Sequence, residues 1–382
     1  MATNLKCRSC KSQLFEPPLL SYKNSPISAQ DFHMNPDQKN NNVSLDIYQC
    51  KKCNLVQHIL DPVPYYKEVI RAVSVSKEME NFRIQQFKEW VELNKLTNKK
   101  YIEIGCGAGD YLEIIRKIGI KKVFGLEYSD KNLALCKTKS LEVIKGYLDG
   151  DLVIQDQQQN GYDAFGIFSF MEHWPNPSEA LSILWDLLAE EAYGIIEVPN
   201  FEMIQKKGLY SEFITDHIFY FDKSSLSQLL QSNGFEIISI KSIWHDYILS
   251  VEVKKRTRLP VSNFKDSFNS LNDELTSYIR NFDNKNIVIW GAGHQSLAII
   301  SLSGIEKYIS FIVDSAAFKQ NKYTSGTNIK IESPEQLKTN KPDAVIIIAA
   351  GYSDEVRKII FNKYSFIKNI AIVRENHLEI IE

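Results

Sequence analysis

A glycine-rich turn, and an acidic residue at a fixed distance from it, are the first candidates for chemistry. An apolar run, residues 100–104, contains Glu103 and leads into alternating glycines: Gly105, Gly107 and Gly109. Glycine adopts positive φ without a Cβ penalty and lets the backbone come close to a ligand. Glu127 ends the next apolar run, where a carboxylate can accept hydrogen bonds from both hydroxyls of a ribose. The pattern predicts a nucleoside site with Tyr128 beside the base; a structural turn with a solvated acid is the alternative.

Four of the six cysteines form two C-x-x-C pairs: Cys7 with Cys10, and Cys50 with Cys53. Four thiolates fill the coordination shell of a tetrahedral metal and leave no open position, so this set predicts a structural zinc site. Redox-active thiols are the alternative, but neither pair stands at the start of a helix in a βαβ unit. The 39 residues between the pairs exceed the usual zinc-ribbon spacing of ~15–20. We therefore expect a long loop, at residues 35–42.

Two other segments place an acid next to a histidine. Glu172 and His173 follow an apolar run that ends near Ser169, and Asp216 and His217 lie within an aromatic segment. Histidine transfers protons near neutral pH, and a neighbouring carboxylate can assist it. The four residues are therefore candidates for general acid–base catalysis, with His217 as the base. The alternative is that the two histidines are structural or orient other groups.

The elements that position these residues follow an alternating strand and helix pattern. Predicted strands cover residues 100–104, 122–127, 143–144, 162–170 and 194–198, with helices at 77–96, 111–118 and 130–140. Such alternation indicates a parallel sheet with helices on both faces, closed here by antiparallel strands at 235–243 and 247–253. Ligands of such sheets lie beyond the carboxyl ends of the strands. That rule gathers the glycine turn, Glu127 and residues 169–173 around one crevice.

A second α/β pattern fills the last third of the chain. Predicted strands cover residues 286–290, 309–313, 344–349 and 370–373, the last of these being the final strand, with helices at 264–281, 297–303 and 354–361. Gly291-x-Gly293-x-x-Ser296, followed by Asp314, fits part of a dinucleotide fingerprint, with serine in place of the third glycine. The possibility that the chain binds a second nucleotide cofactor therefore remains, and an NAD-dependent sugar oxidoreductase is an alternative function.

Bulk composition excludes some classes of partner. The chain has 382 residues, is 44% hydrophobic and carries a formal net charge of −2. Its length suits two or three domains, and its charge favours neither nucleic acid nor an anionic membrane as partner. An apolar signal segment is absent from the first residues, and no stretch approaches the ~20 apolar residues that span a bilayer. We expect a cytoplasmic protein; the sequence does not indicate its oligomeric state.

The turn Glu103-x-Gly105-x-Gly107-x-Gly109 with Glu127 resembles the first motif of class I S-adenosylmethionine (SAM)-dependent methyltransferases. The resemblance implies that SAM lies against the glycines and Ser169, with Glu127 on its ribose. Together with the cysteine pairs and the second glycine turn, the chain is similar to the sugar C-methyltransferase family, which acts on nucleotide-linked 4-keto-deoxysugars. The similarity implies a zinc-binding unit (1–62), a SAM-dependent methyltransferase domain (63–256) and a C-terminal Rossmann-like domain (257–382) that helps to enclose a nucleotide-sugar substrate.

The family's catalytic segment, Tyr-His-Glu-His before an aromatic run, corresponds here to residues 214–217. The resemblance implies His217 as the base and Asp216 as the acidic residue, while Ile214 replaces a tyrosine. A second family tyrosine is absent, with Arg71 near its place. A shared scaffold can serve different acceptors. Methylation of oxygen or nitrogen is therefore an alternative, and so is a non-catalytic protein that keeps the SAM fold.

Overall fold

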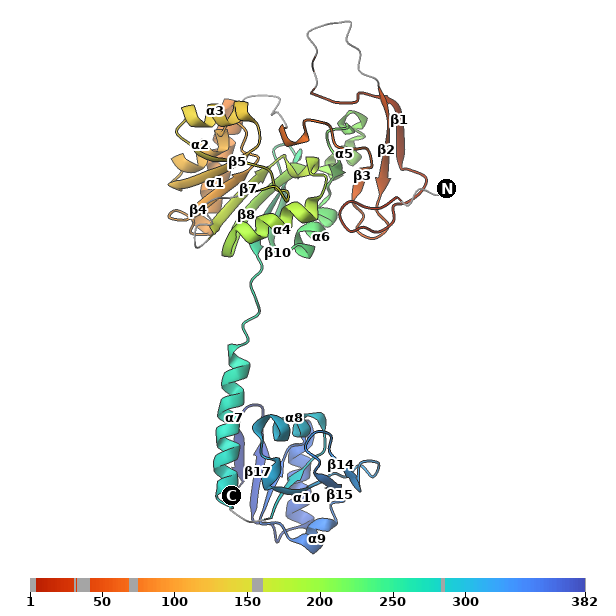
Figure 1. The fold of residues 1–382 in the computed structure, drawn as a ribbon, viewed down its shortest axis with the longest axis vertical. Coiled ribbons are helices and arrows are strands. Elements are labelled where there is room, and N and C mark those ends of the chain that lie inside the picture. Colours follow the sequence, from red (N-terminus) through yellow and green to blue (C-terminus); the bar gives the residue numbers. More distant parts are fainter. Residues whose placement is uncertain are drawn as a thin grey trace. The chain divides into compact units, whose positions relative to one another are not determined.

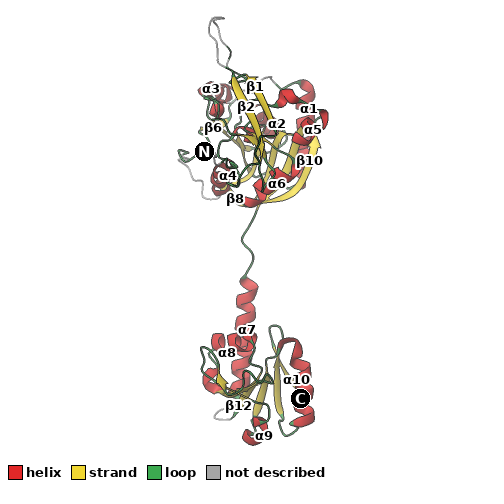
Figure 2. Cartoon of the chain, turned by 90° about the vertical axis from the view of Figure 1, so that its right-hand side faces the viewer, coloured by secondary structure: helices red, strands yellow, loops and turns green. Residues whose placement is uncertain are grey.

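Two compact units, Met1–Thr257 and Arg258–Glu382, make up the chain in this computed structural model (Figure 1). The structure describes residues 5–30, 32, 42–68, 75–152, 161–282 and 286–381. Most of the loop expected at residues 35–42, and Arg71, lie outside the described residues. The finer division into three domains stays a prediction. Each unit combines strands with surrounding helices (Figure 2).

A seven-stranded sheet forms the centre of the first unit, in the order β10-β11-β8-β7-β4-β5-β6. Its strands are β4 (Lys100–Ile104), β5 (Lys122–Glu127), β6 (Glu142–Lys145), β7 (Tyr162–Phe168), β8 (Leu188–Pro199), β10 (Phe235–Ile243) and β11 (Ile248–Lys255). The first five run parallel, while β11 pairs antiparallel with both β8 and β10. The strand order reverses between β4 and β7, which is where a doubly wound sheet opens a crevice for its ligand. This is the class I methyltransferase sheet that the sequence predicts.

Helices cover both faces of this sheet because its strands are apolar on both sides. The helices are α1 (Lys77–Leu93), α2 (Asp110–Lys117), α3 (Asp130–Thr138), α4 (Pro177–Leu187), α5 (Phe201–Lys207) and α6 (Lys223–Ser232). One face packs against α1, α2 and α3 through residues such as Phe87 and Ile115, and the other packs against α4 and α6 through Leu184 and Leu229. A buried ion pair between Arg83 and Glu197, 2.6 Å long, fixes α1 to β8.

A small antiparallel sheet joins the N-terminal segment to this core. It contains β1 (Leu20–Ser25), β2 (Val43–Gln49), β3 (Val56–His58) and β9 (Phe219–Tyr220), in that order. The fourth strand comes from the segment directly after His217, and it pairs with β3 through Val56 opposite Tyr220. The N-terminal segment thus contributes to the structure of the segment that carries the predicted base.

The second unit has its own seven-stranded sheet, in the order β14-β15-β13-β12-β16-β17-β18. The strands are β12 (Ile287–Trp290), β13 (Ile309–Val313), β14 (Lys322–Tyr323), β15 (Lys330–Glu332), β16 (Ala344–Ile347), β17 (Asn369–Val373) and β18 (Leu378–Ile381). The helices are α7 (Ser262–Arg280), α8 (His294–Ser303), α9 (Gln336–Asn340) and α10 (Ser353–Lys363). Helices α7 and α8 pack on one face of the sheet, and α9 and α10 on the other.

The predicted elements of this unit are largely confirmed, but three strands of its sheet were not predicted. The strand at 370–373 is not the last, because β18 pairs with it antiparallel, Ile370 opposite Ile381. The short strands β14 and β15 were also missing from the prediction. Of the helices in the described residues, none combines the length and the apolar character needed to cross a membrane.

Candidate functional site

The first glycine turn connects β4 to α2 at the carboxyl edge of the sheet. All three glycines have positive φ, from +54° at Gly107 to +79° at Gly109, which explains their residue type. The backbone N–H of Gly107 donates to Oε2 of Glu127 over 2.8 Å, and the N–H of Ser129 donates to Oε1 over 2.8 Å. The buried carboxylate of Glu127 is thus fixed against the turn, as the sequence pattern requires.

The space around the glycines differs from one to the next. A Cβ at Gly105 would lie 2.6 Å from the ring of Phe170, and one at Gly109 would lie 2.3 Å from Leu141. A Cβ at Gly107 would meet nothing within 4 Å. Two of the three glycines therefore make room for the protein's own side chains, and Gly107 is the one that leaves open space beside Glu127. An open turn next to a fixed carboxylate fits a nucleoside such as SAM.

The remaining predicted cofactor residues lie at the same edge or just below it. Tyr128 follows Glu127 and is 37% exposed, with the ammonium of Lys67 5.2 Å from the centre of its ring. Ser169 follows β7 with φ of +48°, and its N–H donates to the carbonyl of Glu197. Glu103 lies within β4 and is buried. Tyr128 and Ser169 therefore lie at the carboxyl ends of β5 and β7, whereas Glu103 belongs to the interior of the sheet.

A cluster of one carboxyl and two imidazoles lies next to the turn, with Glu172 and His173 buried and His217 half-buried. Glu172 and His173 form a short 3-10 helix after β7, and the N–H of His173 donates to the carbonyl of Phe170, whose ring covers Gly105. The ring centres of His173 and His217 lie 4.9 Å apart, and Nε2 of His173 is 3.9 Å from Oε1 of Glu172. The structure thus brings together three of the four predicted catalytic residues.

Burial controls the charges of this cluster. Desolvation raises the pKa of Glu172 to about 8 and lowers the pKa of His173 to about 4. Desolvation also lowers the pKa of His217, with His173 and His58 adding to the effect. At neutral pH the cluster therefore holds a protonated carboxyl and two neutral imidazoles. Nδ1 of His173 lies 2.7 Å from the carbonyl of Asp216, so it carries the proton and leaves Nε2 with a lone pair.

The carboxylate of Asp216 contacts the N-terminal segment, and its predicted catalytic role stays a prediction. Its carboxylate accepts hydrogen bonds from the hydroxyl of Tyr65 and the N–H of Ala29, both over 2.8 Å, and no hydrogen bond between this carboxylate and either histidine is found in the described residues. The hydrogen bond to Asp216 and burial together raise the pKa of Tyr65 to about 12, burial being the larger cause. Asp216 therefore ties the base-carrying segment to the N-terminal segment.

His58 makes a second connection of this kind. Its ring is fully buried, with Nε2 3.0 Å from the carbonyl of Thr215 and Nδ1 accepting from the N–H of Leu60. Burial lowers its pKa to about 4, so this ring stays neutral and both nitrogens are used. Sequence patterns gave no signal for either His58 or Tyr65, because their partners lie more than 150 residues away in the chain.

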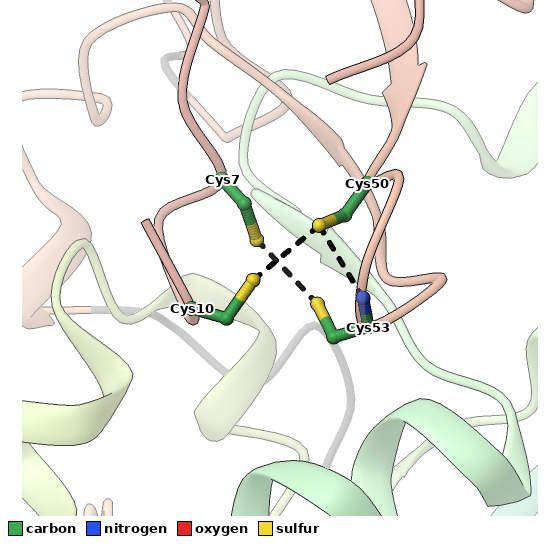
Figure 3. Close-up of side chains that lie close together, drawn as sticks. All are labelled: Cys7, Cys10, Cys50 and Cys53. Atoms are coloured by element: carbon green, nitrogen blue, oxygen red, sulfur yellow. Dashed lines mark hydrogen bonds between the residues drawn. The ribbon is translucent and has the colours of Figure 1, made fainter. Parts of the chain in front are cut away.

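The four cysteines of the two C-x-x-C pairs converge (Figure 3). The Sγ atoms of Cys7 and Cys53 are 3.6 Å apart, those of Cys10 and Cys50 are 3.4 Å apart, and all four lie within 4.8 Å of one another. Sulfurs at ~2.3 Å from a tetrahedral zinc are about 3.8 Å from each other. The donor set and its spacing therefore fit zinc.

The second glycine turn lies at the equivalent edge of the other sheet. The N–H of Ala292 donates to Oδ2 of Asp314 over 2.8 Å, and Nζ of Lys319 donates to the same oxygen over 2.9 Å. A cavity of about 470 Å³ adjoins Gly291, Gly293 and Asp314.

Comparison with known proteins gives matches along most of the chain. A family model described as a methyltransferase domain matches residues 79–240, and one described as a C-methyltransferase C-terminal domain matches residues 251–365. The C-methyltransferase NovU of Streptomyces niveus is 22% identical over 361 residues, which cover 85% of this chain and 84% of that protein. A ubiquinone biosynthesis O-methyltransferase of Shewanella halifaxensis is 29% identical over 93 residues, 24% of this chain and 39% of that protein.

Among solved structures, the plantazolicin methyltransferase BpumL in complex with SAH covers 47% of this chain and 86% of its own, at 17% identity and a TM-score of 0.39. At that TM-score the likeness adds nothing to the two family matches, which cover residues 79–240 and 251–365. The chain is therefore a SAM-dependent methyltransferase, with a match to a methyltransferase domain followed by a match to a C-methyltransferase C-terminal domain.

Proposed function

We propose that this enzyme transfers the methyl group of SAM to a carbon atom of a nucleotide-activated 4-keto-deoxysugar. The observation that supports this most is the cluster of Glu172, His173 and the half-buried His217 next to the glycine turn. The similarity to a protein named C-methyltransferase, over most of both chains, supports carbon as the acceptor. Methylation at oxygen or nitrogen of a related sugar is the alternative outcome of the experiment below.

Gly107 and Glu127 are the residues that we expect to hold the methyl donor. The donor's ribose would lie against the Glu127 carboxylate, which three backbone N–H groups already fix in place. The open space at Gly107 would receive the amino-acid part of the donor. When bound, SAM supplies an electrophilic methyl group to the nucleophilic carbon.

His217 is the base in this proposal. Its ring is neutral at physiological pH because burial lowers its pKa, so a lone pair is available to accept a proton. A carbon beside a ketone is acidic enough for that transfer: the proton moves to His217, and the electron pair of the C–H bond moves into an enolate. Glu172, protonated because burial raises its pKa to about 8, can donate a hydrogen bond to the enolate oxygen.

Hydrogen exchange at the sugar tests proton removal by the base independently of methyl transfer from SAM. The enzyme is incubated in D₂O, without SAM, with thymidine- and uridine-diphosphate-linked 4-keto-6-deoxyhexoses, and deuterium entering the sugar is followed by NMR. We expect exchange at a carbon next to the ketone with the native enzyme and none with His217→Ala. Glu127→Ala is the matched control, because it should keep exchange while losing methyl transfer. Unchanged exchange in His217→Ala would exclude His217 as the base.

We also propose that Cys7, Cys10, Cys50 and Cys53 bind one structural zinc ion. The geometry of the four sulfurs supports it, and four protein ligands leave no position for a substrate. The second cysteine pair flanks the turn between β2 and β3, and β3 in turn pairs with β9. Zinc would therefore stabilise the small sheet that fixes the segment of His217.

A further inference from the structure

Gln57 carries a fully buried side-chain amide that the proposed methyl transfer does not use. It lies in β3, whose backbone is paired on both sides, with Tyr48 of β2 and Phe219 of β9 opposite Gln57. Side chains on a paired strand are held more precisely than those on loops. The sheet therefore sets the position of this amide before any ligand binds.

Both ends of the amide reach the first cysteine knuckle, residues 7–10. Oε1 of Gln57 accepts the backbone N–H of Arg8 over 2.9 Å. A backbone N–H can only donate, so the oxygen occupies this end of the amide, and Nε2 with its two hydrogens occupies the other. Nε2 is buried and has no well-formed hydrogen bond to an atom of the described residues. The polar group with which it interacts is the thiol of Cys7.

The state of Cys7 decides whether this buried N–H is satisfied. A buried donor without an acceptor destabilises the folded protein, and the sulfur of a neutral thiol is only a weak acceptor. A zinc-bound cysteine is a thiolate, whose negative charge makes it a better acceptor. Four thiolates also outweigh the two positive charges of one zinc ion, so N–H groups directed at the sulfurs stabilise the loaded site. The amide of Gln57 thus suits the metal-bound form of Cys7.

The second cysteine knuckle supplies N–H donors of its own. The backbone N–H groups of Lys52 and Cys53 are directed at Sγ of Cys50, each over 3.4 Å, and the one from Cys53 is drawn in Figure 3. Gln57 belongs to neither knuckle. It follows the second knuckle in the chain and contacts Cys7 of the first, so its side chain connects the two halves of the cysteine cluster.

We propose that Gln57 is a positioning residue of the zinc site: its Nε2 donates a hydrogen bond to the Cys7 thiolate, and its Oε1 holds the backbone of the knuckle that carries this cysteine. The inference rests on the proposed structural zinc and assigns part of the zinc affinity to a residue that is not a ligand. Groups that donate hydrogen bonds to metal ligands typically contribute about 10–100-fold to metal affinity.

Chelator competition on the full chain measures this contribution. Zinc bound to the native protein, to Gln57→Met and to Gln13→Met is titrated with a competing chelator. Methionine has nearly the size of glutamine but lacks the amide. Gln13 is the matched control, because it is exposed and its backbone pairs with Lys6, next to Cys7. A melting transition that S-adenosylhomocysteine shifts shows that the first unit of each variant is folded.

We expect Gln57→Met to bind zinc about 10–100-fold more weakly than the native protein, and Gln13→Met to bind it equally well. Equal zinc affinity of Gln57→Met and the native protein would overturn the role of Gln57 and leave the zinc site itself intact. A native protein that binds no zinc would refute the proposed metal, and this inference with it.

A second measurement detects the hydrogen bond directly and requires no variant. The native protein is labelled with ¹⁵N and its zinc is replaced by ¹¹³Cd, and NMR correlations between the metal and amide protons are recorded. A scalar coupling through N–H···S–Cd is expected for one side-chain NH₂ group, and also for backbone amides such as that of Cys53. Backbone couplings without a coupling to a side-chain NH₂ group would overturn the proposal.

Discussion

Alanine substitutions at Gly107 and Gly109 separate a ligand-binding glycine from a packing glycine. Both residues have positive φ, which costs an alanine ~1–2 kcal/mol. At Gly107 the added methyl group enters open space, so the loss of stability should stop at that figure. At Gly109 the methyl group would lie 2.3 Å from Leu141, and overpacking adds ~1–3 kcal/mol. The expected total for Gly109→Ala is therefore ~2–5 kcal/mol.

Ligand affinity should respond in the opposite order. The methyl group of Gly107→Ala stands where we expect the donor to lie, so its binding should weaken about tenfold or more, equal to at least ~1.4 kcal/mol. Gly109→Ala points its methyl group into the protein and should bind the donor with less change once folded. Thermal melting without ligand measures stability, and the transition that S-adenosylhomocysteine shifts reports the first unit. Calorimetry with S-adenosylhomocysteine measures affinity.

Two results would contradict these expectations for Gly107→Ala and Gly109→Ala. If Gly107→Ala bound S-adenosylhomocysteine as tightly as the native protein, the donor would not lie over that turn. If instead both variants lost stability equally, the contact of an added Cβ at Gly109 with Leu141 would not contribute to the free energy of unfolding.

Three further perturbations test other parts of the structure. Cys53→Ala should abolish the zinc content found by metal analysis and lower the melting temperature of the first unit, whereas a metal-free native protein would contradict the zinc proposal. Tyr65→Phe removes the hydroxyl bound to Asp216 and should reduce kcat severalfold with unchanged donor affinity. Tyr66→Phe serves as the control. Equal kcat in the two variants would show that the contact between Tyr65 and Asp216 does not position His217. The folded-state pKa of Glu172, about 8, lies above the ordinary value of 4.5. Glu172 therefore contributes to the stability of the folded protein at low pH, and this contribution is lost as the pH rises toward 8. Glu172→Gln should therefore gain stability over the native protein between pH 6.5 and pH 8 in denaturant titrations, and a constant difference would show that Glu172 does not titrate there.

Local patterns in the sequence were sufficient to predict most of the parallel strands of both sheets, the closing strands of the first sheet and the convergence of the cysteines. Glycine spacing and strand alternation are properties of neighbouring residues, and the rule that sites lie at carboxyl strand ends then placed Glu127 and residues 169–173 correctly at one edge. The same reasoning missed β18, because a short strand at an antiparallel edge has no distinctive pattern of its own.

Contacts between distant segments could not be predicted in this way. The pairing of β3 with β9, and the hydrogen bonds of Tyr65 and His58 to residues 215–216, depend on how the N-terminal segment packs on the core. For the same reason the hydrogen bonds that Ala29 and Tyr65 donate to the Asp216 carboxylate were not predicted. The open space at Gly107, and its absence at Gly105 and Gly109, likewise required coordinates.

Methyl-labelled SAM provides the most direct measurement of the central claim. The enzyme is incubated with ¹³C-methyl SAM and a nucleotide-linked 4-keto-6-deoxyhexose, and the product is analysed by NMR. The proposed function predicts a labelled methyl group bonded to a sugar carbon next to the ketone, and loss of that product in His217→Ala. A labelled methyl group on oxygen or nitrogen, or full product formation without His217, would contradict it.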